Sequence, residues 1–257
     1  MPPASTDGAR SPQVDNRAYY DAFAESYDRP RLRGYHKLID DQAAAIVRRV
    51  GEGKDVLEVG CGTGLVLERV ARFTRSARGV DLSPGMLAKA RARGLSVEEA
   101  SATDLPFSDD SFDVAYSFKV LAHVPEIDAA LAEMVRVVRP GGHVVYDFYN
   151  RHSLRYLAKR LFGPRKTSRS FDESAIPTRF WTIDEALAHL PEGVRLVRID
   201  GIRIATVHAA QVRLPVVGPL TERLEWRLME GPLARLSGFC VLTLQKLGPD
   251  GTVVSEE

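Results

Sequence analysis

The stretch DVLEVGCGTGLVLERV, residues 55–70, changes character twice. It begins as a run of apolar and β-branched residues, passes through Gly60, Gly62 and Gly64 on alternate positions, and continues with the spacing of a helix. Glycine adopts backbone conformations that other residues avoid, and it lets a ligand approach where a side chain would otherwise stand. The stretch therefore predicts a strand, a tight ligand-binding loop and a helix, which is the opening unit of an α/β fold.

Strand and helix patterns alternate from about residue 38 to residue 150. The apolar spacing predicts helices over residues 36–50, 65–73, 84–94 and 127–138, and strands over 55–60, 76–81, 96–100, 111–117 and 143–149. We expect the last of these helices to stop at a Pro140-Gly141-Gly142 turn. Strands separated by helices of this length favour a doubly wound, mostly parallel sheet with right-handed crossovers.

Beyond residue 150 the pattern is less regular. Residues 151–180 form a basic insertion, and Thr182 and Glu185 then have the spacing of a capping box, which predicts the start of a helix. Residues 194–204 and 239–247 are strand candidates, and 221–229 is a helix candidate between them. Two late strands this far apart indicate a final hairpin that carries a long insertion.

The composition bounds the function. The chain has 257 residues, which is enough for one α/β domain. Its 35 Lys and Arg and 34 Asp and Glu give a formal net charge of +1, so it lacks the overall positive charge that is typical of nucleic-acid-binding proteins. With Cys61 and Cys240 alone, no disulfide framework is expected, which favours a reducing, cytoplasmic compartment. No apolar run approaches the ~18 residues of a spanning helix, and residues 1–15 and 248–257 have the composition of disordered tails.

The glycine loop departs from the common nucleotide-binding motifs. A G-x-G-x-x-G loop would place its third glycine at position 65, which is Leu65, and no phosphate-binding G-x-x-x-x-G-K-[ST] occurs. Asp81 ends the second predicted strand, 21 residues after Gly60, where a carboxylate can accept hydrogen bonds from ribose hydroxyls. The alternative is an ordinary helix start, because Ser83-Pro84 can open the next helix. Together the two features favour a nucleoside ligand without phosphates.

Four segments in register, EVGCGTG, GVDLSPGMLAKA, ATDLPFSDDSFDVAYS and MVRVVRPGGHVV, resemble class I S-adenosylmethionine-dependent methyltransferases, in particular the type 11 group that includes quinone-biosynthesis and many small-molecule enzymes. The resemblance covers residues 50–148 closely. It implies a Rossmann-like, seven-stranded, mostly parallel sheet with a C-terminal antiparallel hairpin. It also implies one methyltransferase domain over residues 16–247, with an N-terminal flap at 16–35 and cap or substrate insertions at 151–180 and 205–238.

The resemblance implies a cofactor site for S-adenosylmethionine, whose product is S-adenosylhomocysteine, and no metal. The residues that it assigns to the cofactor are Tyr19, Tyr27, Glu58, Gly60, Cys61, Gly62, Gly64, Asp81, Leu82, Met86, Ser101, Ala102, Thr103, Ser117 and Phe118, with Leu105 packed nearby and Tyr20 in the flap. At position 101 the family often has an acidic residue that accepts from the adenine amino group. Ser101 makes that bond without charge, so either Ser101 or the neighbouring Asp104 is expected at the adenine.

The implied activity is methyl transfer from S-adenosylmethionine to a small molecule, with oxygen favoured over carbon or nitrogen. A hydroxyl acceptor loses a proton, and His123, in LAHVPE after the fourth strand, is the candidate base by resemblance. The alternative is a structural histidine near the start of the following helix. If the acceptor is an amine or an acid, no base is required.

The basic stretch 151–170 leaves the partners open. Leu154, Leu157, Ala158 and Leu161 share a helical face with basic groups around it, which suits an anionic membrane surface, an anionic substrate or an ordinary surface helix. The segment SFKVLAHV lacks the N/D-P-P-[YF] pattern of many nucleic-acid methyltransferases, which argues against nucleic acid. The rival functions are a quinone or lipid methyltransferase at a membrane surface and a non-catalytic S-adenosylmethionine-binding module. The oligomeric state, monomer or homodimer, is left open.

Overall fold

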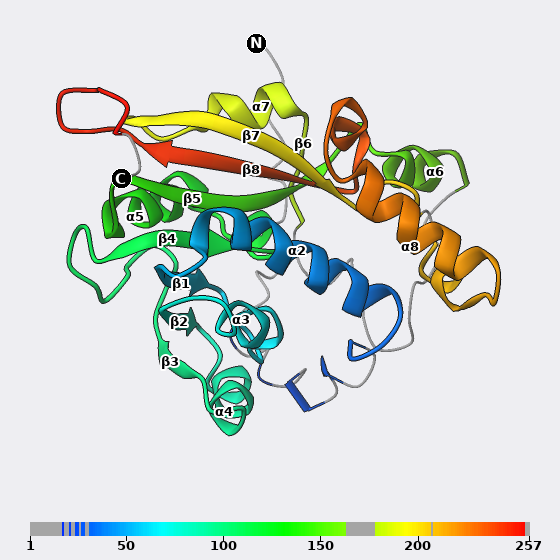
Figure 1. The fold of residues 1–257 in the computed structure, drawn as a ribbon, viewed down its shortest axis with the longest axis horizontal. Helices are drawn as coiled ribbons and strands as arrows, with labels where there is room; N and C mark the ends of the chain where they lie inside the picture. Colours follow the sequence, from blue (N-terminus) through cyan, green and yellow to red (C-terminus); the bar gives the residue numbers. More distant parts are fainter. Residues whose placement is uncertain are drawn as a thin grey trace, which may run out of the picture.

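A twisted β-sheet runs through the middle of the molecule, with helices on both of its faces (Figure 1). The structure is a computed structural model, and it describes Arg17, Asp21, Ala24, Glu25, Tyr27 and Asp28 and residues 31–162, 178–206 and 208–254. Tyr19, Tyr20, the predicted tail 1–15, much of the flap and much of the basic insertion lie outside the described residues.

The described strands form one sheet of eight strands in the order β3-β2-β1-β4-β5-β8-β7, with β6 paired to β5. Their bounds are β1 Asp55–Val59, β2 Ser76–Asp81, β3 Ser96–Glu99, β4 Phe112–Ser117, β5 Val138–Asn150, β6 Phe180–Trp181, β7 Val194–Ile202 and β8 Phe239–Lys246. The first five strands are parallel to one another, whereas β8 is antiparallel to both β5 and β7. The predicted α/β fold with a C-terminal hairpin is confirmed, and the short strand β6 is added to the seven expected.

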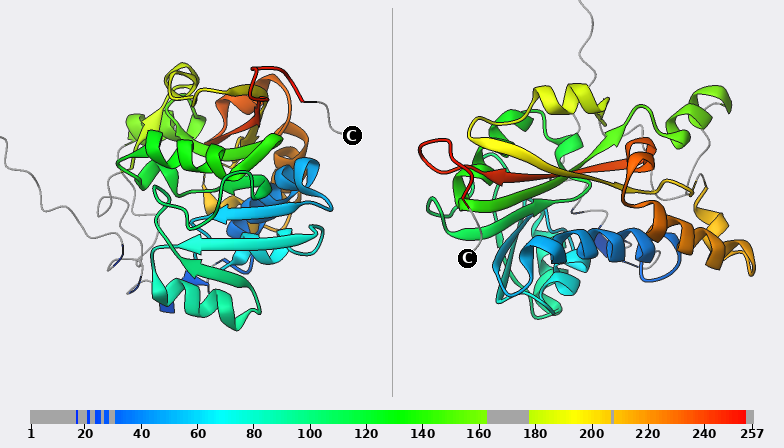
Figure 2. Two further views of the ribbon diagram at one scale, coloured as in Figure 1. Left: turned by 90° about the vertical axis from the view of Figure 1, so that its left-hand side faces the viewer. Right: turned by 45° about the horizontal axis from the view of Figure 1, so that its top comes forward.

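The helices form the two outer layers. Their bounds are α2 Tyr35–Gly51, α3 Leu65–Val70, α4 Pro84–Ala92, α5 Ile127–Val137, α6 Leu154–Phe162, α7 Ile183–Ala188 and α8 Val217–Leu228, with 3₁₀ turns η1 Leu121–His123, η2 Ala209–Arg213 and η3 Pro232–Leu236. One buried cluster joins α5 and α7 to the sheet, and a second joins α2 and α3 to its opposite face. The rotated views show these layers on either side of the twisted strands (Figure 2).

Strand β1 lies in the centre of this sandwich. Its Leu57 and Val59 belong to the cluster that includes α5, while Val56 belongs to the cluster that includes α2. A parallel strand covered by helices on both faces is apolar at consecutive positions rather than at alternate ones. The run DVLEV that opens the deciding stretch has this composition because both of its faces are buried.

Local capping sets the starts of two helices. Ser83 caps α4, because its hydroxyl accepts a hydrogen bond from the Met86 N–H at 3.1 Å, and Pro84 occupies the first helical turn. Thr182 and Glu185 form the predicted capping box at the start of α7. Both helix starts therefore follow from signals in the sequence.

The segment Pro140-Gly141-Gly142 differs from the prediction. Helix α5 ends at Val137, and β5 begins directly at Val138, so these residues form a bulge inside the strand and not a turn before it. The bulge needs glycine, because Gly141 has a φ of 85° and a Cβ on Gly142 would lie 2.4 Å from the Asp113 carbonyl oxygen. The segment does interrupt regular secondary structure, but it does so within the pairing of β4 and β5 and not between a helix and a strand.

The end of the chain also differs from the expected tail. The Gly248 N–H donates to the Thr252 carbonyl at 2.9 Å, and the Gln245 amide donates to the Val254 carbonyl at 3.2 Å. Residues 248–254 therefore form a hydrogen-bonded turn against the sheet, whereas residues 255–257 lie outside the described part of the chain.

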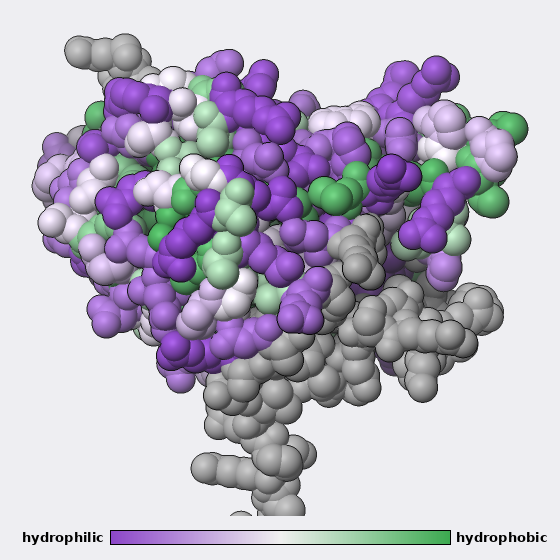
Figure 3. All heavy atoms as spheres, turned by 90° about the horizontal axis from the view of Figure 1, so that it is seen from below, coloured by the Kyte–Doolittle hydropathy of each residue, from purple (hydrophilic) through white to green (hydrophobic). Residues whose placement is uncertain are grey.

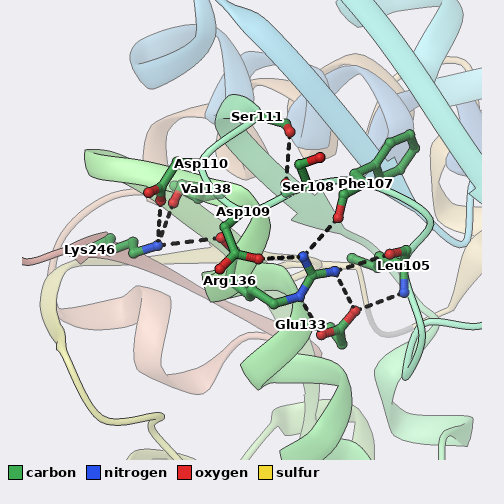
Figure 4. A network of polar contacts seen from close by, with 10 residues as sticks. All are labelled: Leu105, Phe107, Ser108, Asp109, Asp110, Ser111, Glu133, Arg136, Val138 and Lys246. Carbon is green, nitrogen blue, oxygen red and sulfur yellow. Dashed lines mark hydrogen bonds and ion pairs between the residues drawn. The ribbon is translucent and has the colours of Figure 1, made fainter.

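A network around Arg136 fastens the loop before β4 to α5 (Figure 4). The Arg136 guanidinium donates to the carbonyls of Phe107 at 2.7 Å and Leu105 at 3.0 Å, and Glu133 accepts from both Arg136 and the Leu105 N–H. Lys246 donates to the Val138 carbonyl at 2.7 Å close by. This network fixes the loop that follows residues 101–103, which are part of the site described below.

Glu225 performs a similar function between β7 and α8. It is fully buried, and its carboxylate accepts from the Ile204 N–H at 2.9 Å and from both the N–H and the hydroxyl of Thr206 at 2.7 and 2.6 Å. A buried carboxylate with three donors fixes the backbone of this loop.

We therefore expect Glu225→Ala to lower the free energy of unfolding by roughly 2–4 kcal/mol, because it leaves these donors buried without an acceptor. Glu222→Ala, an exposed position on the same helix, should change it by about 0.5 kcal/mol or less. Urea denaturation of the three proteins checks this, and equal losses for both variants would contradict the assignment.

Candidate functional site

A cavity that is partly open to solvent lies at the carboxyl ends of β1, β2 and β4. Open α/β sheets bind ligands at this edge. Of the predicted cofactor residues, those that line the cavity are Tyr27, Glu58, Gly60, Cys61, Gly62, Asp81, Leu82, Met86, Ser101, Ala102, Thr103 and Phe118. The predicted base, His123, lines it as well. Segments far apart in the sequence thus meet where the motif analysis places one site.

The three loop glycines have different functions. All three have positive φ angles, of 79° at Gly60, 54° at Gly62 and 80° at Gly64. A Cβ on Gly60 would lie 2.4 Å from Val120 Cγ2, and one on Gly64 would lie 2.3 Å from Leu95 Cδ1. A Cβ on Gly62 would meet no atom within 4 Å. Two glycines are therefore required by packing as well as by conformation, and Gly62 is the one that borders open space. Gly64 begins α3 and is not part of the cavity lining.

Asp81 holds the glycine loop in place. Its two oxygens accept from the Gly62 N–H at 2.8 Å and the Ser83 N–H at 2.9 Å. Burial raises the pKa of this carboxyl, and the hydrogen bonds from backbone N–H groups oppose that rise. The sequence allowed a ligand-binding carboxylate or an ordinary helix start in this segment, and both features are present: Asp81 lines the cavity, and Ser83 caps α4.

Glu58 is a buried acid in the cavity wall, and it is 3% exposed. The Tyr116 hydroxyl donates to its Oε2 at 3.2 Å. Burial raises the pKa of Glu58 well above its usual range, although the Tyr116 hydrogen bond and the nearby Lys119 ammonium oppose that rise. Its surroundings in the cavity wall therefore disfavour the ionised form of Glu58.

The structure distinguishes between Ser101 and Asp104. Ser101 lines the cavity, where its hydroxyl accepts from the Thr103 N–H at 3.2 Å and shares a hydrogen bond with the Thr103 hydroxyl at 2.8 Å. Asp104 is exposed and is absent from the lining. The uncharged Ser101, and not the acid, is the group presented to a ligand here.

The prediction for Ser117 is corrected. Ser117 is fully buried, lies outside the lining, and donates its hydroxyl to the Val59 carbonyl at 2.8 Å, which joins β4 to β1. The cavity lining on this strand's side begins with the next residue, Phe118, which follows the end of β4. His123 follows in η1, with its ring edge-on to Tyr149 at a centroid distance of 6.0 Å.

Carboxylates of the N-terminal segment bind the loops of the cavity. Asp21 accepts from the Ser83 hydroxyl and from the Gly85 N–H, the latter at 2.9 Å. Asp28 accepts from the Thr63 hydroxyl at 2.6 Å and pairs with Arg93 at 2.7 Å. The family resemblance indicated the tyrosines of YYDAFAESYD and not these acids, although each acid follows a tyrosine in that segment.

Lys119 and Asp40 were also overlooked. The Lys119 ammonium donates to Asp40 Oδ1 at 2.8 Å, and both residues line the cavity. Lys119 has a φ of 61°, and its N–H donates to Asp147 Oδ1 at 2.7 Å. Burial raises the pKa of Asp147 to about 6, with the Lys119 N–H and ammonium opposing. One helical turn before Asp40, burial lowers the pKa of His36 to about 4, so the imidazole there is neutral.

Among the described residues, no group of three or more His, Cys, Asp or Glu side chains is arranged to hold a metal ion. No helix within the same residues has the length and apolar character to cross a membrane.

Comparisons with known proteins identify the family. A family described as "Methyltransferase domain" matches residues 57–146. A ubiquinone biosynthesis O-methyltransferase of Alkalilimnicola ehrlichii is 31% identical over 61% of this chain and 68% of its own length. A demethylmenaquinone methyltransferase of Tropheryma whipplei is 34% identical over 55% of this chain and 62% of its own length. The chain thus spans about two thirds of the length of these curated relatives.

Solved structures show the same fold. A crystal structure from Thermotoga maritima, described as a possible histamine N-methyltransferase, has a TM-score of 0.66 and 21% identity, and the match covers 90% of this chain and 99% of that one. Taken with the relatives, this shows that the chain belongs to the class I S-adenosylmethionine-dependent methyltransferases, as the four motifs indicated.

Asp81→Ala tests the cofactor role of the loop. It removes a carboxylate that accepts two backbone N–H groups and that we expect to bind the ribose hydroxyls, so S-adenosylhomocysteine should bind more weakly by about 1.5–3 kcal/mol. Calorimetric titration measures this, with Asp104→Ala as the matched acid outside the lining. Unchanged affinity in a folded Asp81→Ala protein would place the ribose elsewhere.

Asp147→Asn tests the buried carboxyl behind Lys119. The pKa of Asp147 is raised in the folded state from 3.8 to about 6, so the folded protein loses stability as the pH rises from about 4 to about 6 and does not regain it above. The asparagine keeps an oxygen for the Lys119 N–H and does not ionise. The variant should therefore exceed the wild type in unfolding free energy above pH 6, by about 3 kcal/mol at most, with the difference shrinking toward pH 4. A difference that is constant between pH 4.5 and 7.5 in urea denaturation would contradict this.

Proposed function

We propose that this protein transfers a methyl group from S-adenosylmethionine to a hydroxyl group of a small molecule. The observation that supports it is the cavity, which combines the glycine loop and Asp81 with a second, polar wall formed by Asp40, Lys119 and His123. The first set suits a nucleoside, and the second leaves room for an acceptor beside it. O-methylation is also the activity in the name of the Alkalilimnicola relative.

The lining fits this cofactor chemically. Asp81 offers carboxylate oxygens to ribose hydroxyls, and the uncharged Ser101 and Thr103 lie with Leu82 and Met86 where an adenine ring can pack. Buried Glu58 lies at the end of β1, where an acid can receive an ammonium group. When bound, S-adenosylmethionine supplies a methyl group on a positively charged sulfur, so the protein need not activate the methyl donor.

The protein then has to orient the acceptor and exclude water. Holding two reactants in line at near-attack distance removes much of the entropic barrier to their reaction. We assign this positioning to Phe118, Val120 and His123, which follow β4 and line the cavity. The predicted flap and the insertions 151–180 and 205–238 complete the domain of residues 16–247 in this proposal and select the acceptor.

A second candidate, an acceptor held at a membrane surface, has support from exposed apolar side chains on α8 and directly before it. Val216 is 82% exposed, Leu220 56% and Trp226 41%, and Arg223 and Arg227 are exposed on the same helix. Apolar side chains gather at this end of the molecule in the space-filling view (Figure 3). On α6, which belongs to the basic stretch 151–170, Leu154 and Leu157 are also exposed, by 47% and 52%.

Methyl transfer is tested by following S-adenosylhomocysteine formation with a panel of phenols and aliphatic alcohols and their amine analogues. We expect turnover of hydroxyl acceptors that falls at least tenfold in Asp81→Ala and is retained in Asp104→Ala. Tight binding of S-adenosylhomocysteine with no product from any acceptor would instead support the non-catalytic binding module. Preference for the amines would overturn O-methylation.

The membrane candidate has its own readout. Sedimentation with anionic and with neutral phospholipid vesicles at low salt should show binding to the anionic ones only, weakened in Arg223→Glu/Arg227→Glu. If the protein sediments with neither the anionic nor the neutral vesicles, the membrane candidate is excluded.

A further inference from the structure

Asp40 and Lys119 form a buried ion pair in the cavity wall that the cofactor assignment does not use. Asp40 lies on α2 and is 1% exposed, and Lys119 follows β4, 79 residues later. The Lys119 ammonium donates to Oδ1 at 2.8 Å, and both residues belong to the lining. Burial of an ion pair is unfavourable unless hydrogen bonds satisfy its remaining polar atoms.

The second oxygen of Asp40 is left unsatisfied. Within the described part of the chain, Oδ2 is buried and has no hydrogen-bond partner. An ionised oxygen in that state is costly, by more than a neutral one, so a donor is expected to reach it in the working protein. Because Asp40 lines the cavity, a molecule bound there can supply that donor.

The surroundings select the kind of donor. The Lys119 ammonium donates to Oδ1, and its backbone N–H donates to Asp147, so neither of these donors satisfies Oδ2. Asp40, Glu58 and Lys119 line this part of the cavity, and Asp147 lies behind Lys119, where it accepts from the Lys119 backbone N–H. An ionised carboxylate has no hydrogen to donate to Oδ2, whereas a neutral hydroxyl can donate to it.

We propose that Asp40 Oδ2 binds the reacting hydroxyl of the acceptor and takes its proton, an inference that rests on the proposed function. The O–H bond breaks with its electron pair left on oxygen, that pair forms the bond to the methyl carbon, and the carbon–sulfur bond electrons stay on sulfur. The proton remains on Oδ2 until product leaves and then passes to water. Lys119 is the positioning residue, because it fixes the rotation of the carboxylate through Oδ1.

His123 is the rival for this role. It is the base that the family resemblance suggested, and it also lines the cavity. Its ring packs edge-on to Tyr149 and comes from η1, whereas Asp40 comes from α2. Variants at the two positions therefore separate the two assignments.

Phenol and anisole are the probes, because they differ by the hydroxyl hydrogen that the proposal requires. With the protein saturated by S-adenosylhomocysteine, NMR titration should give at least tenfold tighter binding of phenol than of anisole to the wild type. Asp40→Asn should lower this preference by at least fivefold. Asp41→Asn, the next residue, which pairs with Lys37 and Arg69 away from the lining, should keep it.

Should Asp40→Asn not fold, Asp40→Leu/Lys119→Met replaces the whole buried pair with apolar groups, a change that proteins often tolerate. In that variant anisole should bind as tightly as phenol or tighter.

Three results would each overturn the proposal. The wild type could show no preference for phenol over anisole, the variants at Asp40 could keep that preference, or the preference could be lost in His123→Asn alone. Weakened S-adenosylhomocysteine binding with an intact phenol preference would assign Oδ2 to the cofactor instead. Failure of the wild type to bind S-adenosylhomocysteine would be a failure of the proposed function, and it is seen before any probe is added.

Discussion

The close approach of Gly60 to Val120 is the constraint on which the rest of the site depends. With a φ of 79° and no room for a Cβ, which would lie 2.4 Å from Val120 Cγ2, Gly60 lets the loop after β1 lie directly against the segment after β4. Asp81 then holds the same loop from the other side through the Gly62 N–H. The cavity exists because these two strand ends are held together without a side chain between them, which leaves Gly62 facing open space.

Polar contacts from outside the motif keep that arrangement rigid. Asp21 and Asp28 bind the starts of α4 and α3 from the N-terminal segment, and Arg136 holds the loop that follows Ser101. Each bond joins parts of the chain that are distant in sequence. A site supported in this way keeps the geometry that methyl transfer requires, because its side chains have few alternative positions.

Local signals account for what the sequence predicted well. Strand β1 and the start of α4 follow from burial on two faces and from the Ser83-Pro84 cap, so Glu58 and Asp81 were placed correctly at strand ends in the cavity lining. Side-chain direction was not predictable, which is why Ser117 was assigned to the cavity although its hydroxyl binds Val59. The Asp40–Lys119 pair was missed because neither residue belongs to a motif, and only the packing of α2 against the sheet brings them together.

The central claim is that the cavity is built for S-adenosylmethionine and not for a dinucleotide. Calorimetric titration of the purified wild-type chain with S-adenosylhomocysteine, and separately with NAD, tests it most directly. We expect one site with micromolar affinity for S-adenosylhomocysteine and no heat of binding with NAD, because Leu65 stands where a dinucleotide loop needs its third glycine. Binding of NAD, or of neither compound, would contradict it.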